Sequence, residues 1–507
     1  MSVKTAKLET TFLDGNGYIV PTKDLTPEKL KDILTDLTVY VDSYLSAKRK
    51  IVLYSKELNG YHVPRLYGIA NFGIPKLIRM SEGISIAERV SNVTYKLADF
   101  QVKCMNYILS NYYTPKQISE GSAGCICDLP CGRGKTLMGL DLIVRFKRRA
   151  LIVCHACSPV KQWIEHFNKF VPNAIVKKYK GELEMTSDVV VITVHRLARH
   201  NSKIKHTTRE YNAWFGTFGT VVFDEIHAYG SDENSTVFDL VYPRHLFGLS
   251  ATPERIDWME KIYGNKVGPI IYSTERLGIE TPKFNGCVRL VDPPIARLHP
   301  DGSDSAAVIK AMTLNLERLR ELLETIKFQF LEDPSVSIIV ACNYIAEVDL
   351  AYDRIAPPLS AMNRKVRKAY SDMLPEQVSD AADEADVLIG TYSKIGTGFS
   401  VSKYTSIHIW SPTRQKHKQM IGRICRWRDG DKAHNTKTRI VYDWIDRQTI
   451  AASQYFLQHK ENSKIKHSRR ENYLELGWQI CCPADRKSQR EQSVTGVVEY
   501  FKELGLE

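Results

Sequence analysis

The chain has 507 residues, of which 43% are hydrophobic and 25% are charged, with a net charge of +12 at pH 7. These values are typical of a globular protein and exclude a fibrous, low-complexity or largely disordered chain. No stretch reaches the roughly 18 apolar residues of a membrane span, and residues 1–7 lack the apolar core of a signal peptide. We therefore expect a soluble intracellular protein without a membrane partner. The positive charge favours an anionic polymer as partner, with a basic surface kept for solubility as the alternative.

The first 95 residues carry no nucleotide-binding signal. A proline-led helix is predicted over residues 27–37 and a short strand over 51–54. We interpret residues 1–95 as a small α+β N-terminal accessory domain.

From residue 97 onward, apolar strands alternate with amphipathic helices, which is typical of a parallel sheet covered on both faces. This pattern predicts an α/β domain over residues 96–282. The predicted strands are 124–127, 150–154, 189–193, 221–223 and 246–249, with helices at 136–145 and 159–170.

A second alternating set begins after a loop-like stretch and predicts another α/β domain over residues 283–450. A long helix is expected over 311–331. The predicted strands are 336–341, 387–390, 406–410 and 439–442. Residues 451–507 are polar and basic, with a cluster at 464–470, and we assign them to a basic C-terminal extension.

A phosphate-binding loop is predicted at residues 128–136, which read DLPCGRGKT. Gly132 and Gly134 permit a tight turn whose backbone N–H groups surround phosphates, and Lys135-Thr136 opens a helix with its positive dipole end toward them. A generic loop of this kind has glycine five residues before Gly134, but this chain has Leu129.

Two carboxylates follow an apolar strand at Val-Val-Phe-Asp224-Glu225. At the exit of a parallel strand, Asp224 is placed to reach Mg²⁺ through water, and Glu225 to polarise the attacking water. A surface Asp–Glu pair is the alternative. His227 suits a group that couples the nucleotide to its surroundings, or a structural histidine, and Ser250-Ala-Thr252-Pro253 by itself indicates only a turn.

Arg423 and Arg426 lie in QMIGRICR and are three residues apart, hence on one face if the segment is helical. Two guanidiniums that reach a γ-phosphate from a neighbouring domain are arginine fingers, which raise rates about 10³–10⁵-fold in related chemistry. A solvated basic helix face is the alternative, and the interleaved apolar residues favour burial.

In this order the segments LADFQ (97–101), LPCGRGKT (129–136), DEIH (224–227), SATP (250–253), TYSKIGTGFS (391–400) and QMIGRICR (419–426) resemble a superfamily 2 helicase. The phosphate loop is similar to that of the XPB branch, a pattern that accounts for Leu129. The layout and the run VPRLYG at 63–68 resemble the poxvirus-type transcript-release helicases of large DNA viruses, with the UvsW-like phage branch-migration helicases next. The resemblance implies two tandem RecA-like domains.

The resemblance also implies roles for single residues. Gln101 reads the adenine edge; Lys135 and Thr136 hold the β- and γ-phosphates and Mg²⁺; Asp224 binds the metal and Glu225 is the base; His227, Ser250 and Thr252 couple hydrolysis to strand movement. The implied catalytic residues are Glu225, Lys135, Arg423 and Arg426. The implied ATP-binding residues are Gln101, Pro130, Cys131, Gly132, Arg133, Gly134, Lys135, Thr136, Asp224, Gly398 and Gln419. Candidate strand contacts are Ser158, Pro159, Thr193, His195, Arg196, Thr391, Tyr392 and Lys394. The basic clusters 364–368 and 414–418 would extend these contacts, with a solvated surface as the alternative for each.

We therefore predict an ATP- and Mg²⁺-dependent helicase or translocase, a DNA-stimulated ATPase that acts in viral transcript release or DNA remodelling. Its expected partner is single-stranded or forked DNA, with RNA and the transcription machinery as further candidates. The protein is expected to be a monomer in the host cytoplasm or the virion. A double-strand translocase of recombination and repair, and a non-hydrolysing nucleic-acid clamp, are the alternatives.

Overall fold

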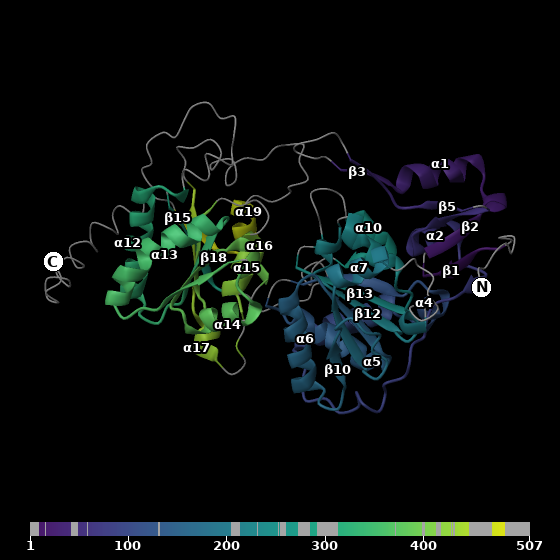
Figure 1. Ribbon diagram of the computed structural model, residues 1–507, viewed down its shortest axis with the longest axis horizontal. Coiled ribbons are helices and arrows are strands. Elements are labelled where there is room, and N and C mark those ends of the chain that lie inside the picture. Colours follow the sequence, from purple (N-terminus) through teal and green to yellow (C-terminus); the bar gives the residue numbers. More distant parts are fainter. Residues whose placement is uncertain are drawn as a thin grey trace. The chain divides into compact units, whose positions relative to one another are not determined.

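The computed structural model divides the chain into two compact units, residues 1–281 and 282–507 (Figure 1). None of the helices in the described part of the chain is long and apolar enough to cross a bilayer. The described residues are 10–15, 17–41, 49–57, 59–129, 132–203, 213–230, 232–251, 253, 260–271, 284–291, 313–370, 372–397, 401–411, 417–426, 428, 431–445 and 469–481.

Unit 1 begins with a five-stranded mixed sheet in the order β5-β6-β2-β1-β7. Its first helix starts as the sequence predicts, because the Thr26 hydroxyl accepts a bond from the Lys29 N–H and Pro27 occupies the first turn. The elements of this region are β1 (Phe12–Asp14), β2 (Gly17–Pro21), η1 (Thr22–Asp24), α1 (Pro27–Asp36), β3 (Thr38–Val41), β4 (Arg49–Val52), β5 (Ser55–Glu57), β6 (Gly60–Val63), α2 (Arg65–Phe72) and β7 (Leu77–Ile78), with β3 and β4 as a separate hairpin.

Arg65 joins this accessory sheet to the rest of unit 1. Its guanidinium is buried and Nη2 donates to the carbonyls of Ala123 and Val267, each at 3.1 Å. Burial lowers the pKa of Arg65 to about 10. These two bonds tie α2 to the start of the next sheet, while Nε and Nη1 of the same guanidinium are buried without a hydrogen-bond partner among the described residues.

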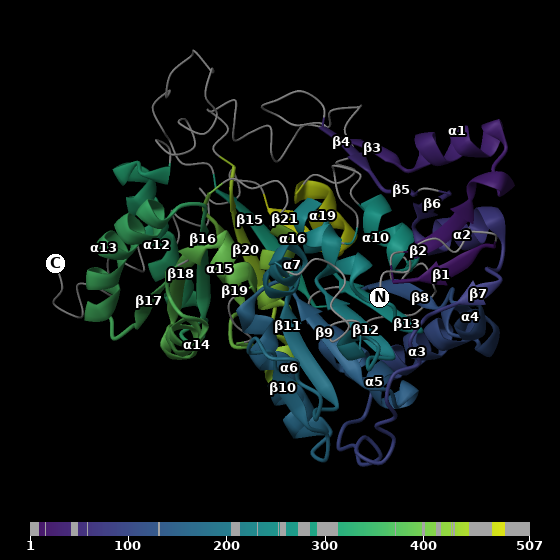
Figure 2. The ribbon, with the colours of Figure 1, turned by 45° about the vertical axis from the view of Figure 1, so that its right-hand side comes forward.

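The second sheet of unit 1 has seven parallel strands in the order β10-β11-β9-β12-β13-β8-β14 (Figure 2). Alternate residues of β9 enter opposite cores: Ile152 and Cys154 pack with α3, α5 and α6, and Leu151 and Val153 pack on the other face. Its strands are β8 (Gly124–Asp128), β9 (Ala150–Cys154), β10 (Val176–Lys178), β11 (Val189–Thr193), β12 (Thr220–Asp224), β13 (His245–Ser250) and β14 (Ile270–Ile271). Its helices are α3 (Asp99–Tyr112), α4 (Pro115–Glu120), α5 (Lys135–Phe146), α6 (Cys157–Phe170), α7 (Val194–Lys203), η2 (Ile226–Tyr229), α9 (Asp232–Ser235), η3 (Thr236–Asp239) and α10 (Glu260–Lys266).

Unit 2 repeats this plan with seven parallel strands in the order β17-β18-β16-β19-β20-β15-β21. Helices α12 and α13 cover one face, and α14, α15 and α16 cover the other (Figures 1 and 2). Its strands are β15 (Gly286–Val291), β16 (Ile338–Cys342), β17 (Val366–Ala369), β18 (Val387–Thr391), β19 (Ser406–Ile409), β20 (Arg439–Trp444) and β21 (Gln479–Cys481). Its helices are α12 (Leu316–Glu332), α13 (Ile345–Ala361), α14 (Pro375–Glu384), α15 (Tyr392–Thr397), α16 (His417–Ile424), α17 (Lys432–Thr436) and α19 (Arg469–Glu475). The expected fold, two tandem RecA-like domains after a small mixed-sheet region, is confirmed.

Residues 469–481 complete the sheet of unit 2, although the sequence suggested a basic extension after residue 450. Strand β21 pairs in parallel with β15. Arg469 and Asp443 form an ion pair of 2.9 Å with side chains at most 1% exposed, and the Tyr473 hydroxyl donates to the same carboxylate. Because a buried charge without its partner is costly, this pair holds the late segment in the fold.

The basic cluster at 364–368 overlaps the edge strand β17. This strand was not predicted from the sequence, because its composition is polar. Arg367 pairs with Glu384 at 3.0 Å and Lys368 with Asp349 at 2.8 Å. These cations therefore have partners within unit 2, and charged residues on an edge strand discourage further strand pairing.

Acid should destabilise unit 1 through His245. This ring is buried, stacks on Phe146 at 3.9 Å between centroids and donates from Nδ1 to the Gly219 carbonyl. Burial lowers its pKa to about 4, below the value of about 6.5 in an unfolded chain. The neutral ring therefore makes its full contribution to the stability of the folded state above pH 6.5. As the pH falls toward 4, the free energy of unfolding decreases by up to about 3 kcal/mol.

The measurement is the free energy of unfolding of unit 1 by urea at pH 7 and pH 5, for the wild type and the His245→Asn variant. The variant should lose most of the difference between the two pH values. His195→Asn, at an exposed position, is the control and should keep it. An equal pH dependence in all three proteins would contradict the assignment to His245.

Candidate ATP site of unit 1

The phosphate loop follows β8 at the carboxyl edge of the first parallel sheet. Leu129, the departure from the generic pattern, is fully buried, and its N–H donates to the Ser250 carbonyl at 3.0 Å. The position is thus a core position that ties the loop to β13. Pro130 and Cys131 lie outside the described residues.

Gly132 and Gly134 have φ angles of +78° and +74°, which glycine adopts without the steric cost that other residues incur. Gln101 on α3 is buried beside them, with Nε2 donating to the Arg133 carbonyl and Oε1 accepting from the Ala98 N–H, each at 3.0 Å. The structure therefore places Gln101 as a support of the loop. Its contact with an adenine stays a prediction.

Helix α5 begins at Lys135, directly after Gly134, and no side chain caps its first turn. Its leading N–H groups and positive dipole end are therefore suited to an anion. Thr136 is the second residue of this helix and is half-buried. Lys135 Nζ lies 3.4 Å from the Leu129 carbonyl and 3.5 Å from Glu225 Oε1.

Asp224 is the last residue of β12, which lies between β9 and β13. Its carboxylate is 7% exposed and accepts a bond of 3.0 Å from the indole N–H of Trp163 on α6. Burial, and next the charge of Glu225, raise the pKa of Asp224 to about 6, against the opposing effects of Trp163 and Lys135. Burial and the neighbouring charge both disfavour ionisation of the carboxylate, so a nearby positive charge would stabilise the ionised form.

Glu225 has φ 51° and ψ 55°, the left-handed conformation that non-glycine residues rarely adopt. Such strain persists where the surroundings enforce it and is frequent at functional sites. This turn aims the carboxylate at two partners: Oε1 lies 3.5 Å from Lys135 Nζ, and Oε2 lies 3.4 Å from His227 Nδ1. The same Nδ1 is 2.8 Å from Ser250 Oγ. A continuous polar chain therefore runs from the phosphate loop to the end of β13.

The residues present fit Mg²⁺. This ion takes hard oxygen ligands, often one or two carboxylates beside phosphate oxygens. Asp224 supplies a buried carboxylate, and Thr136 supplies a hydroxyl at the start of α5. Thr252, the remaining coupling candidate, lies outside the described residues.

The candidate strand contacts of unit 1 are the ends of β11 and the starts of α6 and α7. Thr193 is buried, whereas His195 and Arg196 are exposed, and Arg196 Nη1 donates to the Tyr179 carbonyl at 3.0 Å. Pro159 lies in the first turn of α6. The side chain of Ser158 is outside the described part of the structure.

In unit 2, the proposed contact at Tyr392 needs correction. Its ring is 1% exposed in the core, and its hydroxyl donates to the Ser411 carbonyl at 2.6 Å. Thr391 is also buried, with Oγ1 3.2 Å from Ser393 Oγ. Lys394 Nζ donates to the Met373 carbonyl at 2.6 Å.

The two candidate arginine fingers do not share a helical face as expected, because α16 ends at Ile424. Arg423 is on the helix and donates to the Gly396 carbonyl, and Arg426 follows its end. Gly398, the Gln419 side chain and the basic cluster at 414–416 lie outside what the structure describes.

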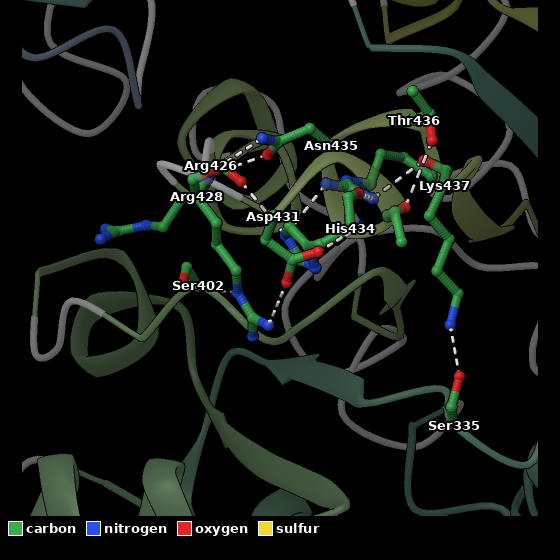
Figure 3. A network of polar contacts seen from close by, with 11 residues as sticks. Ser335, Ser402, Arg426, Arg428, Asp431, His434, Asn435, Thr436 and Lys437 are labelled. Carbon is green, nitrogen blue, oxygen red and sulfur yellow. Dashed lines mark hydrogen bonds and ion pairs between the residues drawn. The ribbon is translucent and has the colours of Figure 1, made fainter.

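Arg426 enters a polar network that orders the chain between α16 and β20 (Figure 3). His434 Nε2 lies 3.2 Å from the Arg426 carbonyl. Arg428 exchanges two hydrogen bonds with Asn435 and also contacts Asp431 at 3.3 Å. Asp431 in turn caps α17 by accepting from the His434 N–H at 2.8 Å. The backbone that presents Arg426 is thus held by side chains that follow it in the chain.

Sequence reasoning missed Trp163 and Arg65. Trp163 lies on the apolar face of an amphipathic helix, where a core residue is expected, and no local signal shows that its N–H meets a carboxylate 61 residues later. Arg65 lies in the run 63–68 that carried part of the resemblance, but its partners are 58 and 202 residues away in the sequence.

Several known proteins are similar to this chain. The family model "Type III restriction enzyme, res subunit" matches residues 94–255. The mimivirus protein of Acanthamoeba polyphaga named "Putative ATP-dependent RNA helicase L396" is 24% identical over 90% of this chain and 88% of its own. "Putative ATP-dependent RNA helicase QP509L" of African swine fever virus is 25% identical over 66% of this chain and 67% of its own. "Putative helicase 055L" of Frog virus 3 is 27% identical over 59% and 66%.

The motifs, the two parallel sheets and these relatives together confirm the predicted class: the chain is an ATP-hydrolysing helicase of superfamily 2. Its relatives are helicases of large DNA viruses.

Substitution of Gly134 should impair nucleotide binding more than its backbone angle alone explains. A Cβ at this position would lie 2.4 Å from Gln101 Nε2, and φ is +74°. Gly73 offers a matched control, since its φ is +81° but no atom lies within 4 Å of an added Cβ. Gly134→Ala should weaken binding of a fluorescent ATP analogue at least tenfold, about 1.4 kcal/mol, whereas Gly73→Ala should bind as the wild type does. Equal affinities in the two variants would contradict the tight fit.

Proposed function

We propose that this chain uses ATP to move along a nucleic acid strand and, in large DNA viruses, serves transcript release or remodelling of DNA. The observation that carries the proposal is the polar chain from Lys135 through Glu225 and His227 to Ser250. It links the group that meets phosphates to the end of a neighbouring strand, as a motor requires if hydrolysis is to change the position of protein segments.

In the proposed mechanism, the N-terminal turn of α5 and Lys135 bind the β- and γ-phosphates of ATP. Thr136 and Asp224 would hold Mg²⁺, which would supply positive charge to offset the charge of these phosphates. Glu225 accepts the proton of the attacking water, for which its strained backbone orients the carboxylate. His227 and Ser250 respond to the change at Glu225, since both lie on the same polar chain.

We propose that unit 2 contributes residues to ATP hydrolysis. Arg423 and Arg426, with Gly398 and Gln419, would close on the γ-phosphate, and the difference between the closed and the open state would move the strand. Without these arginines, unit 1 should bind ATP but hydrolyse it poorly. A complete set of Lys135, Asp224, Glu225 and both arginines speaks against a clamp that has lost turnover.

The proposed substrate is a single strand or fork, held mainly through its phosphates. Two of the viral relatives are named RNA helicases, and the net charge of +12 suits either nucleic acid. Exposed His195 and Arg196 at the start of α7 are the described candidates for phosphate contact in unit 1. We propose a monomer that acts with the transcription machinery.

Hydrolysis should depend on a strand and on Glu225. We expect single-stranded nucleic acid to stimulate ATP turnover by the full chain, and Glu225→Gln to reduce turnover by about 10²–10⁴-fold while it retains ATP binding, because the amide cannot accept the proton. Phosphate release is measured with single-stranded DNA, duplex, fork and RNA. Glu182→Gln, which changes an exposed carboxylate of the same unit, should behave as the wild type.

The proposal would be refuted if wild-type turnover were no higher than that of Glu225→Gln with every ligand. Displacement of bound protein without strand separation would favour a double-strand translocase.

Strand binding should weaken steeply as salt rises from about 50 to 200 mM, because phosphate contacts release counterions. Arg196→Ala should reduce the slope of log affinity against log salt by about one. Lys437→Ala is the matched control, since Lys437 is paired with Asp333 and Ser335. Fluorescence anisotropy of a labelled strand measures both slopes, and a flat salt response would show that the net charge serves another purpose.

A further inference from the structure

Trp163 is the largest side chain in contact with the candidate metal ligand. It is fully buried in the core on one face of the first parallel sheet, and its Nε1–H donates to Asp224 Oδ2 at 3.0 Å. An indole nitrogen has one donor and no acceptor. The bond therefore fixes which carboxylate oxygen faces α6 and leaves the other directed elsewhere.

The indole has little freedom to turn away. A Cβ added to Gly139 on α5 would lie 2.7 Å from Trp163 Cη2, and one of the nearest atoms at the same position belongs to Val222 of β12. The ring thus packs closely against the helix that begins with Lys135, in the same core as Val222 of the strand that ends with Asp224. Close packing of this kind transmits displacement, because interiors have few voids to absorb it.

Helix α6 connects this contact to a second feature of the site. It begins at Cys157, just after β9 ends at Cys154, at the edge of the sheet where the phosphate loop and Asp224 also lie. Pro159, a candidate strand contact, is on its first turn. Trp163 lies four residues further along, about 6 Å along the helix axis. One rigid helix therefore carries both groups.

We propose that Trp163 is a positioning residue: it orients the Asp224 carboxylate for Mg²⁺, and it makes that orientation depend on the position of α6. Strand contact at the start of α6 and metal–nucleotide binding at Asp224 are then coupled, each favouring the other. Only this coupling rests on the proposed function. The orientation of Asp224 does not require that the protein moves along a strand.

The experiment uses the full chain with Trp163→Phe, which keeps an aromatic ring and removes the N–H. Trp214→Phe is the matched control: Trp214 is 1% exposed in the other core of unit 1, and its Nε1–H donates to the Glu184 carbonyl at 2.8 Å, away from the carboxylates. The readout is the affinity for a fluorescent ATP analogue with Mg²⁺ divided by the affinity in EDTA. We expect this ratio to fall about tenfold in Trp163→Phe, as for loss of a bond to a charged group, and to stay at the wild-type value in Trp214→Phe.

A third variant separates positioning from packing. Trp163→His has a smaller ring than phenylalanine but retains an N–H donor, so positioning predicts a higher Mg²⁺-dependent ratio than in Trp163→Phe, and packing predicts a lower one. If Trp163→Phe does not fold, the comparison is made between Trp163→His and Trp214→Phe, which should then differ by less than about threefold. Equal ratios in Trp163→Phe and Trp214→Phe would overturn the proposal. So would a Trp163→His protein that binds no better than Trp163→Phe or does not fold.

The coupling has its own readout, the increase in ATP-analogue affinity when a saturating single strand is added in the presence of Mg²⁺. Trp163→Phe should lose most of this increase, and Trp214→Phe should keep it. An undiminished increase in Trp163→Phe would refute the coupling. A wild-type chain that no strand affects would refute the proposed function instead, and the Mg²⁺-dependent ratio would still decide the role of Trp163.

Discussion

A carboxylate buried at the end of an apolar strand is the constraint on which the rest of the ATP site depends. Asp224 follows Val221, Val222 and Phe223, and it has lost most of its contact with water. A charge in such a place must be compensated by neighbours, because desolvation disfavours the ionised form. Here the indole N–H of Trp163 and the charge of Lys135 oppose the effect of burial, which still raises the pKa of Asp224 to about 6. In the proposed mechanism, a bound Mg²⁺ would add to this compensation.

The neighbouring Glu225 meets the same constraint in a different way. Its left-handed backbone turns the side chain from the strand direction toward Lys135 and His227. Two adjacent carboxylates therefore receive different surroundings, one buried against an indole and the other in a polar chain that ends at Ser250. The roles that we propose, metal binding for Asp224 and proton acceptance for Glu225, call for such different environments.

Unit 2 shows how segments distant in sequence complete a sheet. Strand β21 enters from beyond residue 450 and is held by the Arg469–Asp443 pair, while the network around Arg428 and Asn435 fixes the chain that follows α16. Charged residues have different structural roles in β17 and in α19. In β17 they protect a sheet edge, and in α19 one is fully buried. The sequence suggested an extension of the strand contacts for the first segment and a basic C-terminal extension for the second.

The sequence by itself determined the features whose chemistry is local. A phosphate loop, a pair of carboxylates after an apolar strand and a strand–helix alternation each involve residues close together in the chain, so their backbone and polarity can be interpreted directly. That information predicted the class of protein, both parallel sheets and the cluster of Lys135, Asp224 and Glu225. Only the tertiary structure decided which residues support them. Trp163 against Asp224, Arg65 against the start of β8, Leu129 in the core, buried Tyr392 and strand β21 all depend on contacts between distant segments. Such contacts depend on packing and on the pairing of buried polar groups. Neither of these produces a periodic pattern in the sequence from which the contacts could be predicted.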